Sequence, residues 1–301
     1  MNSYKMLIVL LLMPSLMMAK VFKFVDIDTA SPELISMREM RFCYISFVKV
    51  NGEVFLVKQK IPVNKLLGAA RDALTAYIMA DSSRENIAHK VDIIPAGKDF
   101  PGKKRLDWPA TIHTIAPGRM IKGQKSLYKK MNIKQAELGF RRDMLPWMAS
   151  HTTLATIVAY DTFMCNHDRH RGNLFYDKSN DSFCAIDMDS AYKYNLCSLA
   201  CNNLMDMINS GLLTFKSTEI KALMIYRDTL KRLIAKYKPE DTIALYNHFV
   251  EKAGFVEGSP LYTRKIQLEL DRNRAMMRES YADAQRLVKI VNAIIRRVIK
   301  V

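Results

Sequence analysis

Two short stretches decide the fold of this chain: NHDRHRGNLF at residues 166–175 and FCAIDMD at residues 183–189. The first is typical of a polar loop that leads into a strand, and the second of an apolar strand that ends at Asp187. A hairpin between the two strands would bring Asn173 close to Asp187. Both side chains offer hard oxygen ligands, which suits Mg²⁺, an ion that prefers one or two carboxylates together with phosphate oxygens.

A further carboxylate, Asp168, lies in the same loop, five residues before Asn173. Outside the metal pair, this side chain could accept the proton of a hydroxyl group or orient a nucleophile. We expect His170 to brace the loop by hydrogen bonding rather than to bind metal. The loop therefore combines a metal ligand with a candidate general base.

The part of the chain before this loop is rich in strand signals. Residues 41–50 (RFCYISFVKV) alternate aromatic and β-branched residues, Asn51-Gly52 is a two-residue turn signal, and residues 53–60 (EVFLVKQK) form the return strand. An amphipathic helix is predicted over residues 65–79. Two short strands follow, at residues 89–95 and 110–116. The expected result is a small, mostly antiparallel sheet with one helix.

After Pro117-Gly118 the pattern becomes helical. Apart from short strands at 174–177 and 183–187, the chain is predicted to form helices at residues 133–145, 152–165, 217–236, 239–252 and 260–300. The sequence thus predicts an α+β fold of two lobes, with a β-rich lobe at residues 20–117 and a larger helical lobe at residues 118–301. Ligands often bind where two such domains meet.

The sequence DRHRGN at residues 168–173, followed by Asp187, resembles the catalytic and metal-binding loops of the atypical branch of the kinase superfamily. The likeness is to phosphatidylinositol 3/4-kinase-like enzymes, with HipA-like and secretory-pathway kinases as relatives, and covers about residues 21–250. It implies a two-lobed protein-kinase-like fold with a catalytic loop at 166–173 and a metal loop at 186–189. The metal loop reads Asp-Met-Asp from residue 187, not the usual Asp-Phe-Gly.

The resemblance also implies an activity. ATP with Mg²⁺ (or Mn²⁺) would be bound, and the γ-phosphoryl group would pass to a hydroxyl of a protein or inositol-lipid acceptor. Asp168 would be the catalytic base, and Asn173 and Asp187 would bind metal together with the nucleotide. Two alternatives stay open: a catalytically inactive kinase-fold module that docks an anionic partner, and a nucleotidyl (AMP) transferase on the same fold.

A kinase also needs a lysine on its third strand to hold the nucleotide phosphates. By resemblance Lys58 takes that place, with Lys60 on the same strand face as the competing choice. Residues 71–74 (RDAL) resemble the Arg-Gln-Asp-x-Leu run of lipid kinases. Asp72 is therefore the expected ion-pair partner of Lys58, and Glu85 is the alternative.

A glycine-rich phosphate loop is missing from the sequence, because no glycine occurs between Asp26 and Arg41. Lipid-kinase-like branches also lack this loop. Ser31 and Ser36 are the candidates for phosphate contacts in its place.

The chain is strongly basic, with 46 Lys and Arg against 30 Asp and Glu and a formal net charge of +16. Residues 98–142, here called the basic segment, hold twelve Lys or Arg and three acids. The segment is either a solvated surface or a site for phosphoinositides, inositol polyphosphate, an acidic substrate or an anionic membrane surface. Few aromatic residues interleave the charges, which disfavours nucleic acid.

Residues 1–19 have the single charge, the short apolar run and the small final residue of a secretory signal peptide. Export is the expected outcome, with a cytoplasmic location if the segment is retained; a buried N-terminal helix or strand is the alternative. The five cysteines lack the spacing of a zinc site and are predicted to be buried thiols. In an exported chain one disulfide could form. With 49% hydrophobic and 25% charged residues, the composition excludes disordered and collagen-like chains.

Overall fold

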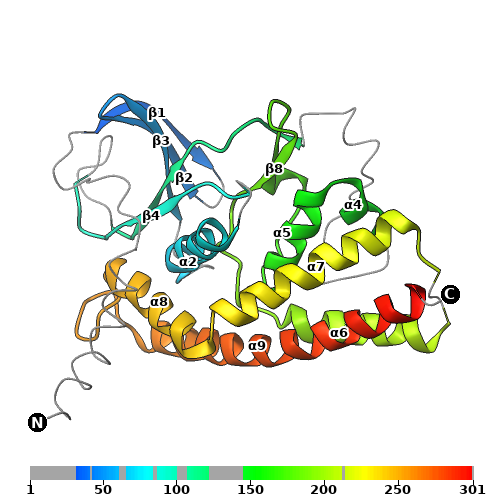
Figure 1. Ribbon diagram of the computed structural model, residues 1–301. Coiled ribbons are helices and arrows are strands. Elements are labelled where there is room, and N and C mark those ends of the chain that lie inside the picture. The colour runs from blue at the N-terminus through cyan, green and yellow to red at the C-terminus, as the bar shows by residue number, and fades with distance from the viewer. Residues whose placement is uncertain are drawn as a thin grey trace, which may run out of the picture.

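The computed structural model of the protein describes residues 32–40, 43–60, 66–83, 87–99, 107–121, 145–211 and 214–299. The predicted signal peptide lies outside these residues, and so does most of the basic segment. Figure 1 shows a curved sheet with one helix beneath it, joined to a larger body of helices. The predicted α+β fold of two lobes is confirmed.

The sheet of the first lobe has five antiparallel strands in the order β1-β2-β3-β5-β4. Their bounds are β1 Glu33–Met40, β2 Cys43–Val50, β3 Glu53–Lys60, β4 Val91–Ile94 and β5 Ala110–Thr114. The turn at Asn51 and Gly52 forms as predicted: their φ angles are 51° and 88°, and both central residues of this tight hairpin turn need a positive φ. Of the strand predicted from residue 41, the described part is β2 from Cys43, and residues 41 and 42 lie outside the described residues.

The two faces of this sheet carry different side chains. Val48, Phe55 and Val57 point to one face, where they form a small apolar cluster with residues of β4 and β5. Cross-strand partners point to the same side of a sheet, and residues two apart share a face. Lys58 therefore lies on the opposite face, in a row with its partners Ile45 and Thr111.

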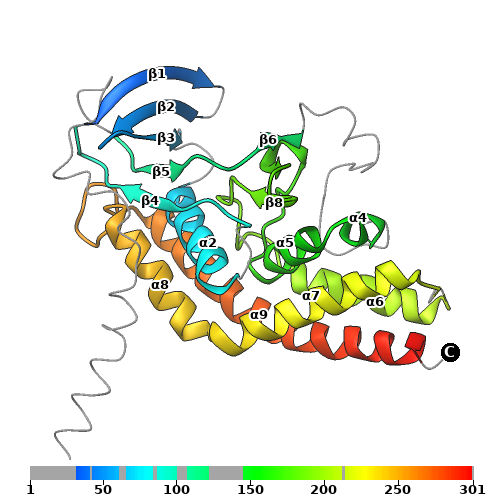
Figure 2. The ribbon, with the colours of Figure 1, turned by 45° about the horizontal axis from the view of Figure 1, so that its top comes forward.

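That opposite face is covered in part by helix α2, Gly68–Ser82. The helix begins three residues later than predicted and continues three residues further, since Ala80, Asp81 and Ser82 keep the helical conformation. Almost every side of it is buried, including the charged residues Arg71 and Asp72. Figure 2 shows α2 between the sheet and the helical lobe, so this helix packs against both.

The helices of the second lobe are α4 Leu145–Ser150, α5 Thr152–Phe163, α6 Leu196–Asn209, α7 Ser217–Lys236, α8 Pro239–Lys252 and α9 Arg264–Ile299. The bounds predicted for α7 and α8 are confirmed to the residue, whereas α6 was not predicted. Its sequence mixes Cys, Ser and Asn with apolar residues, and the side chain of Asn195 caps its first turn by accepting from Ser198 N. Apart from Leu145, the helix predicted at 133–145 lies outside the described residues.

A second sheet, of order β6-β7-β8, lies at the boundary of the lobes, with β6 at Arg119–Met120, β7 at Leu174–Asp177 and β8 at Ser182–Ala185. The chain enters β6 through Gly118, which has a φ of 83°. A β-carbon on this residue would lie 2.1 Å from the carbonyl oxygen of Tyr176. Only glycine fits so close a crossing.

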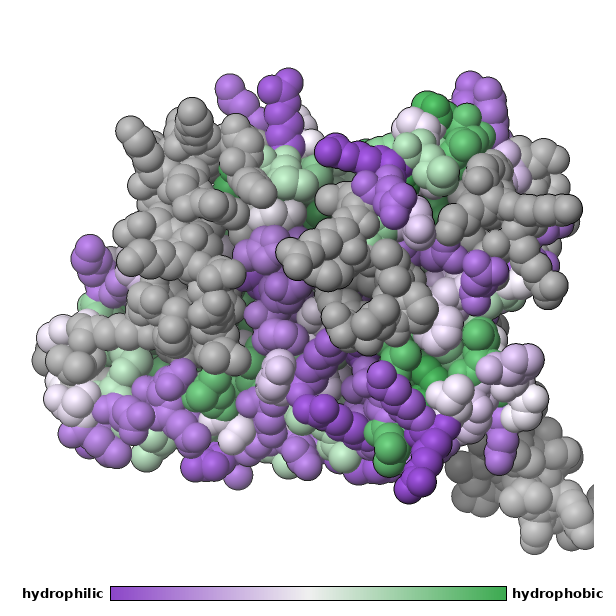
Figure 3. Space-filling view, turned by 180° about the vertical axis from the view of Figure 1, so that it is seen from behind, coloured by the Kyte–Doolittle hydropathy of each residue, from purple (hydrophilic) through white to green (hydrophobic). Residues whose placement is uncertain are grey.

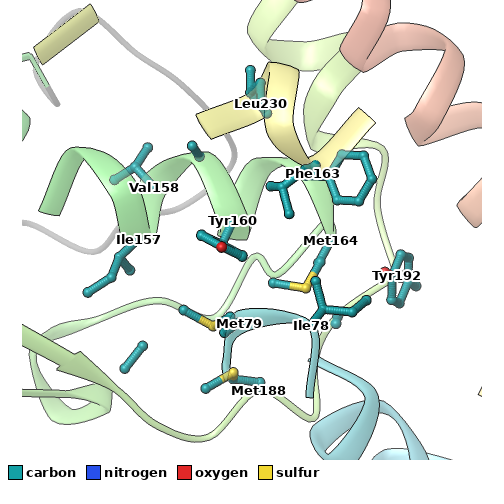
Figure 4. Packing of buried hydrophobic residues seen from close by; sticks show 14 of the residues in the cluster. Ile78, Met79, Ile157, Val158, Tyr160, Phe163, Met164, Met188, Tyr192 and Leu230 are labelled. Atoms are coloured by element: carbon teal, nitrogen blue, oxygen red, sulfur yellow. The ribbon is translucent and has the colours of Figure 1, made fainter. Parts of the chain in front are cut away.

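One apolar core extends through the helical lobe and α2. Figure 4 shows Ile78 and Met79 of α2 beside Met164, which follows α5, and Met188. Fully burying a side chain of this size stabilises the fold by roughly 1.5 to 3 kcal/mol. All five cysteines lie in the described residues, and each is a buried free thiol, as predicted. Within the described part of the chain, no helix combines the length and apolar character needed to cross a membrane.

Candidate active site

Lys58 extends from the sheet to the loop that follows β8. Its Nζ lies 2.6 Å from Oδ1 of Asp187 and 3.8 Å from Oδ2 of the buried Asp189. The lysine comes from one lobe and the two carboxylates from the other. The ion pair thus marks the place where the lobes meet.

The backbone of Asp187 is in the left-handed region, with a φ of 56°. Such a conformation costs a residue with a side chain on the order of 1 kcal/mol or more, so neighbouring contacts must hold it. On one side Ile186 N donates to the carbonyl of Asn173 at 3.1 Å, and on the other Met188 N donates to Oδ1 of Asp72 at 3.0 Å. The turn at Asp187 ends β8 at Ala185, two residues before the end of the predicted strand.

The predicted hairpin brings Asn173 to this loop. β7 and β8 are antiparallel, and Leu174 pairs with Ala185, so Asn173 lies beside Ile186. The Asn173 side chain is buried, and its Nδ2 donates to the carbonyl of Asp168 at 2.8 Å. Its amide oxygen is then the atom that could coordinate a cation.

Asp168 lies in the loop between α5 and the short 3₁₀ helix Arg171–Asn173. Its side chain is 39% exposed, and Oδ1 is 4.0 Å from Nε2 of His170. His170 also accepts a hydrogen bond at Nδ1 from Gly172 N, 2.9 Å away, so its predicted bracing role is confirmed. A half-exposed carboxylate on a braced loop is accessible to an acceptor molecule.

Arg169 ties the loop at residues 166–173 to the loop at residues 186–189, the predicted catalytic and metal loops, a role that sequence reasoning missed. The side chain is 3% exposed, and its Nη1 donates to the carbonyls of Asn173 and Ile186, both at 2.7 Å. Nε and Nη2 donate to the carboxylate of Asp161 in α5, at 2.8 and 2.9 Å. Burial alone would lower the pKa of this guanidinium, but the charge and hydrogen bonds of Asp161 raise it. Arg169 is therefore a buried cation that holds two loops by their backbone.

Asp72 lies against the backbone of the metal loop. Besides the bond to Met188 N, its Oδ2 is 3.9 Å from Nε2 of His113. The ion pairs that the structure gives for Lys58 are those with Asp187 and Asp189, not the expected pair with Asp72. The pair of Lys58 with Asp72 was expected from a family motif. In the structure, helix α2 is oriented so that the Asp72 carboxylate accepts from Met188 N in the metal loop instead.

The other residues that the sequence proposed for the site lie partly on the sheet and partly outside the described residues. Ser36 of β1 pairs with Phe47, which pairs with Leu56, so Ser36 lies on the sheet face of Lys58. Lys60 is the last residue of β3, opposite Cys43. Ser31 and Glu85 lie outside the described residues.

Two buried histidines connect the sheet to the metal loop, and sequence reasoning did not identify them. Nδ1 of His89 is 3.2 Å from the carbonyl of Ala185, and its Nε2 is 2.7 Å from Nδ1 of His113. Nε2 of His113 lies 2.6 Å from Oγ1 of Thr111, and Thr111 pairs with Lys58 across the sheet. Burial lowers the pKa of His89 despite the nearby charge of Asp72. Burial thus favours the neutral form of His89, which packs with His113 between Lys58 and β8.

Among the described residues, no group of three or more His, Cys, Asp or Glu side chains could hold a metal ion alone. Asp187 supplies a carboxylate where the lobes meet, and Asn173, whose backbone carbonyl accepts from Ile186 N, supplies an amide oxygen on the adjoining strand end. Mg²⁺ is often bound by one or two such groups together with substrate phosphates. The donor set fits a metal shared with a nucleotide.

Comparison with known proteins gives little further guidance. No family model matches the chain, and no curated protein matches it. Among solved structures, the proinflammatory kinase CtkA of Helicobacter pylori is similar over 89% of this chain and 97% of its own, with 10% sequence identity and a TM-score of 0.43. So distant a likeness does not bear on function. The chain's own strands and helices are consistent with a kinase-like arrangement of two lobes, and a closer relation to phosphatidylinositol 3/4-kinases stays a hypothesis.

Proposed function

We propose that the protein is an atypical kinase that binds ATP with Mg²⁺ (or Mn²⁺) and transfers the γ-phosphoryl group to a hydroxyl acceptor. The observation that carries the proposal is the convergence of Lys58 from the sheet with Asp187 and Asn173 from the helical lobe. Phosphoryl transfer depends mainly on positioning and on neutralising phosphate charge. A cation and two oxygen donors at one point supply these requirements.

Each side chain then has a distinct role. Lys58 binds the α- and β-phosphates and exchanges its contact with Asp187 for them. Asp187 and Asn173 hold the metal ion, which when bound neutralises the phosphate oxygens. Asp168 accepts the proton of the acceptor hydroxyl, as its exposure on the loop allows. The strained backbone of Asp187 supports this assignment, because strain of this kind gathers at functional sites.

A second cation could replace the missing glycine-rich loop. Arg38 pairs with Ile45, which pairs with Lys58, so Arg38 and Lys58 lie on the same face, two strands apart. Strands are about 4.8 Å apart, which separates the two backbones by roughly 10 Å. We assign Arg38 to the phosphate side of the nucleotide.

The acceptor is proposed to be a protein or an inositol lipid. In the basic segment Lys98 and Arg119 are described, and both are exposed. Positive charge along this segment would favour an acidic or phosphorylated acceptor. Export directed by residues 1–19 is a separate proposal, which N-terminal sequencing of the mature chain would test.

Mass spectrometry of products formed from ATP labelled at the γ- or α-phosphate tests the function. A kinase transfers the γ-label to a hydroxyl acceptor, an AMP transferase the α-label, and an inactive module neither. Asp168→Asn should lower γ-transfer by about 10² to 10⁴-fold, while Asp206→Asn, a change on the exposed side of α6, should leave it unchanged. Absence of γ-transfer from the folded wild-type chain to protein and inositol-lipid acceptors would contradict the proposal.

A further inference from the structure

Helix α9 reaches the metal loop through a single buried side chain. Arg71 of α2 is 0% exposed, and its Nη1 lies 2.6 Å from Oε1 of Glu269 in α9. The same guanidinium donates from Nε to the carbonyl of Asp189 at 2.8 Å. Glu269 is 198 residues away from Arg71 in the sequence, yet one side chain separates it from the loop that carries Asp187.

Two consecutive residues of α2 hold that loop. Asp72 accepts a hydrogen bond from Met188 N, and Arg71 donates one to the carbonyl of Asp189. Both bonds fix the backbone immediately after Asp187, whose φ of 56° must be maintained by its surroundings. A shift of Arg71 would therefore displace the backbone that orients the Asp187 carboxylate.

Arg71 can keep this position only with a counter-charge, because a buried guanidinium without one is strongly unfavourable. Glu269 provides the charge from α9, and its own side chain is 26% exposed. One turn further along α9, Asn273 donates to the hydroxyl of Tyr246 in α8 at 2.7 Å, which fixes the helix against its neighbour. Figure 3 shows the molecule from behind, with mostly hydrophilic residues along its lower edge, where α9 lies in Figure 1. Glu269 thus connects the partly solvated long helix with the interior.

We propose that Glu269 is a positioning residue of the active site, which holds Arg71 and, through Arg71, the backbone of the metal loop. The inference rests on the proposed function. It makes α9, which lies outside the sequence resemblance, a part of the catalytic apparatus.

The test compares Glu269→Gln with Asp271→Asn, two residues further along the same helix. Asp271 is 56% exposed and contacts Gln267 and Arg274 of its own helix, so it is a matched control. We would measure the Mg²⁺ concentration for half-maximal transfer at saturating ATP, and hydrogen exchange at the amide of Met188. Glu269→Gln should raise both the Mg²⁺ requirement and the exchange rate by roughly tenfold to a hundredfold, since every 1.4 kcal/mol lost from the contacts that hold the loop is a factor of about ten. Asp271→Asn should change neither.

A merely structural role for Glu269 would lower the melting temperature and leave the Mg²⁺ requirement of the folded enzyme unchanged. That result, or exchange at Met188 equal to the control, would overturn the inference. If Glu269→Gln does not fold, Glu269→Asp keeps the charge but lengthens the gap to Arg71, and a smaller rise in both quantities is expected. If the wild-type chain transfers no phosphate, the proposed function fails, and exchange at Met188 still decides whether Glu269 holds the loop.

Discussion

Asp161→Asn is expected to lower the free energy of unfolding by about 3 to 5 kcal/mol, the usual cost of removing one partner from a buried ion pair. Arg169 is 3% exposed, and two of its nitrogens donate to the two carboxylate oxygens of Asp161. Asparagine keeps the shape of the side chain but removes the charge and presents an NH₂ group to one donor. The guanidinium then keeps its two carbonyl acceptors but loses the carboxylate that it pairs with in the interior. Because most domains are stable by only about 5 to 15 kcal/mol, the loss is a large share of the total.

Urea unfolding followed by tryptophan fluorescence measures this loss. Glu240→Gln is the control, because Glu240 binds Arg278 through the same kind of contact, with Nε 2.9 Å from Oε1, at the surface. Exposed pairs contribute little, so the control should keep the wild-type midpoint. A loss below about 1 kcal/mol for Asp161→Asn, or equal effects of the two changes, would refute the burial argument.

Four further changes test the site. Lys58→Met should lower turnover by about 10² to 10³-fold and raise KM for ATP, with Lys60→Met much milder; the reverse order would show that Lys60 holds the phosphates. Asp168→Asn should lower turnover by about 10² to 10⁴-fold and keep ATP affinity in calorimetry; weaker ATP binding would make Asp168 a metal ligand instead. Arg38→Ala should raise KM for ATP several-fold without changing turnover at saturation, and an unchanged KM would remove Arg38 from the phosphate site. Burial holds the pKa of His89 below its ordinary value, so the unfolded chain binds more protons below about pH 6.5. The free energy of unfolding should therefore fall as the pH drops through that value, and an equal slope in His89→Gln would exclude His89 as its source.

Local signals were sufficient for much of the fold. Asn51-Gly52 predicted its hairpin because few residues tolerate two successive positive φ angles. The bounds of α7 and α8 followed from regular apolar spacing and, at Pro239, from a residue that favours the first turn. Helix α6 lacked such signals, since its polar small residues are common in loops as well.

The sequence predicted only those parts of the site that are formed by residues close to one another along the chain. The hairpin of β7 and β8 follows from residues close in sequence, and it brings Asn173 to the metal loop. The partners of Arg71 and Arg169 depend on how helices pack. No spacing in the sequence indicates that Glu269 meets a residue nearly two hundred positions earlier.

The burial of α2 on almost all sides has a consequence for how the protein can move. Moving this helix away from the helical lobe would separate Arg71 from Glu269 and Asp72 from Met188 N. Buried charges would then be left without partners. We therefore expect α2 and the helical lobe to move as one rigid body. The apolar cluster that joins β2 and β3 to β4 and β5 is small, so the strands β1 to β3 are the part that can flex above the helix. Motion between the lobes would then be a bending of the sheet, because displacing this helix would separate its buried charges from their partners.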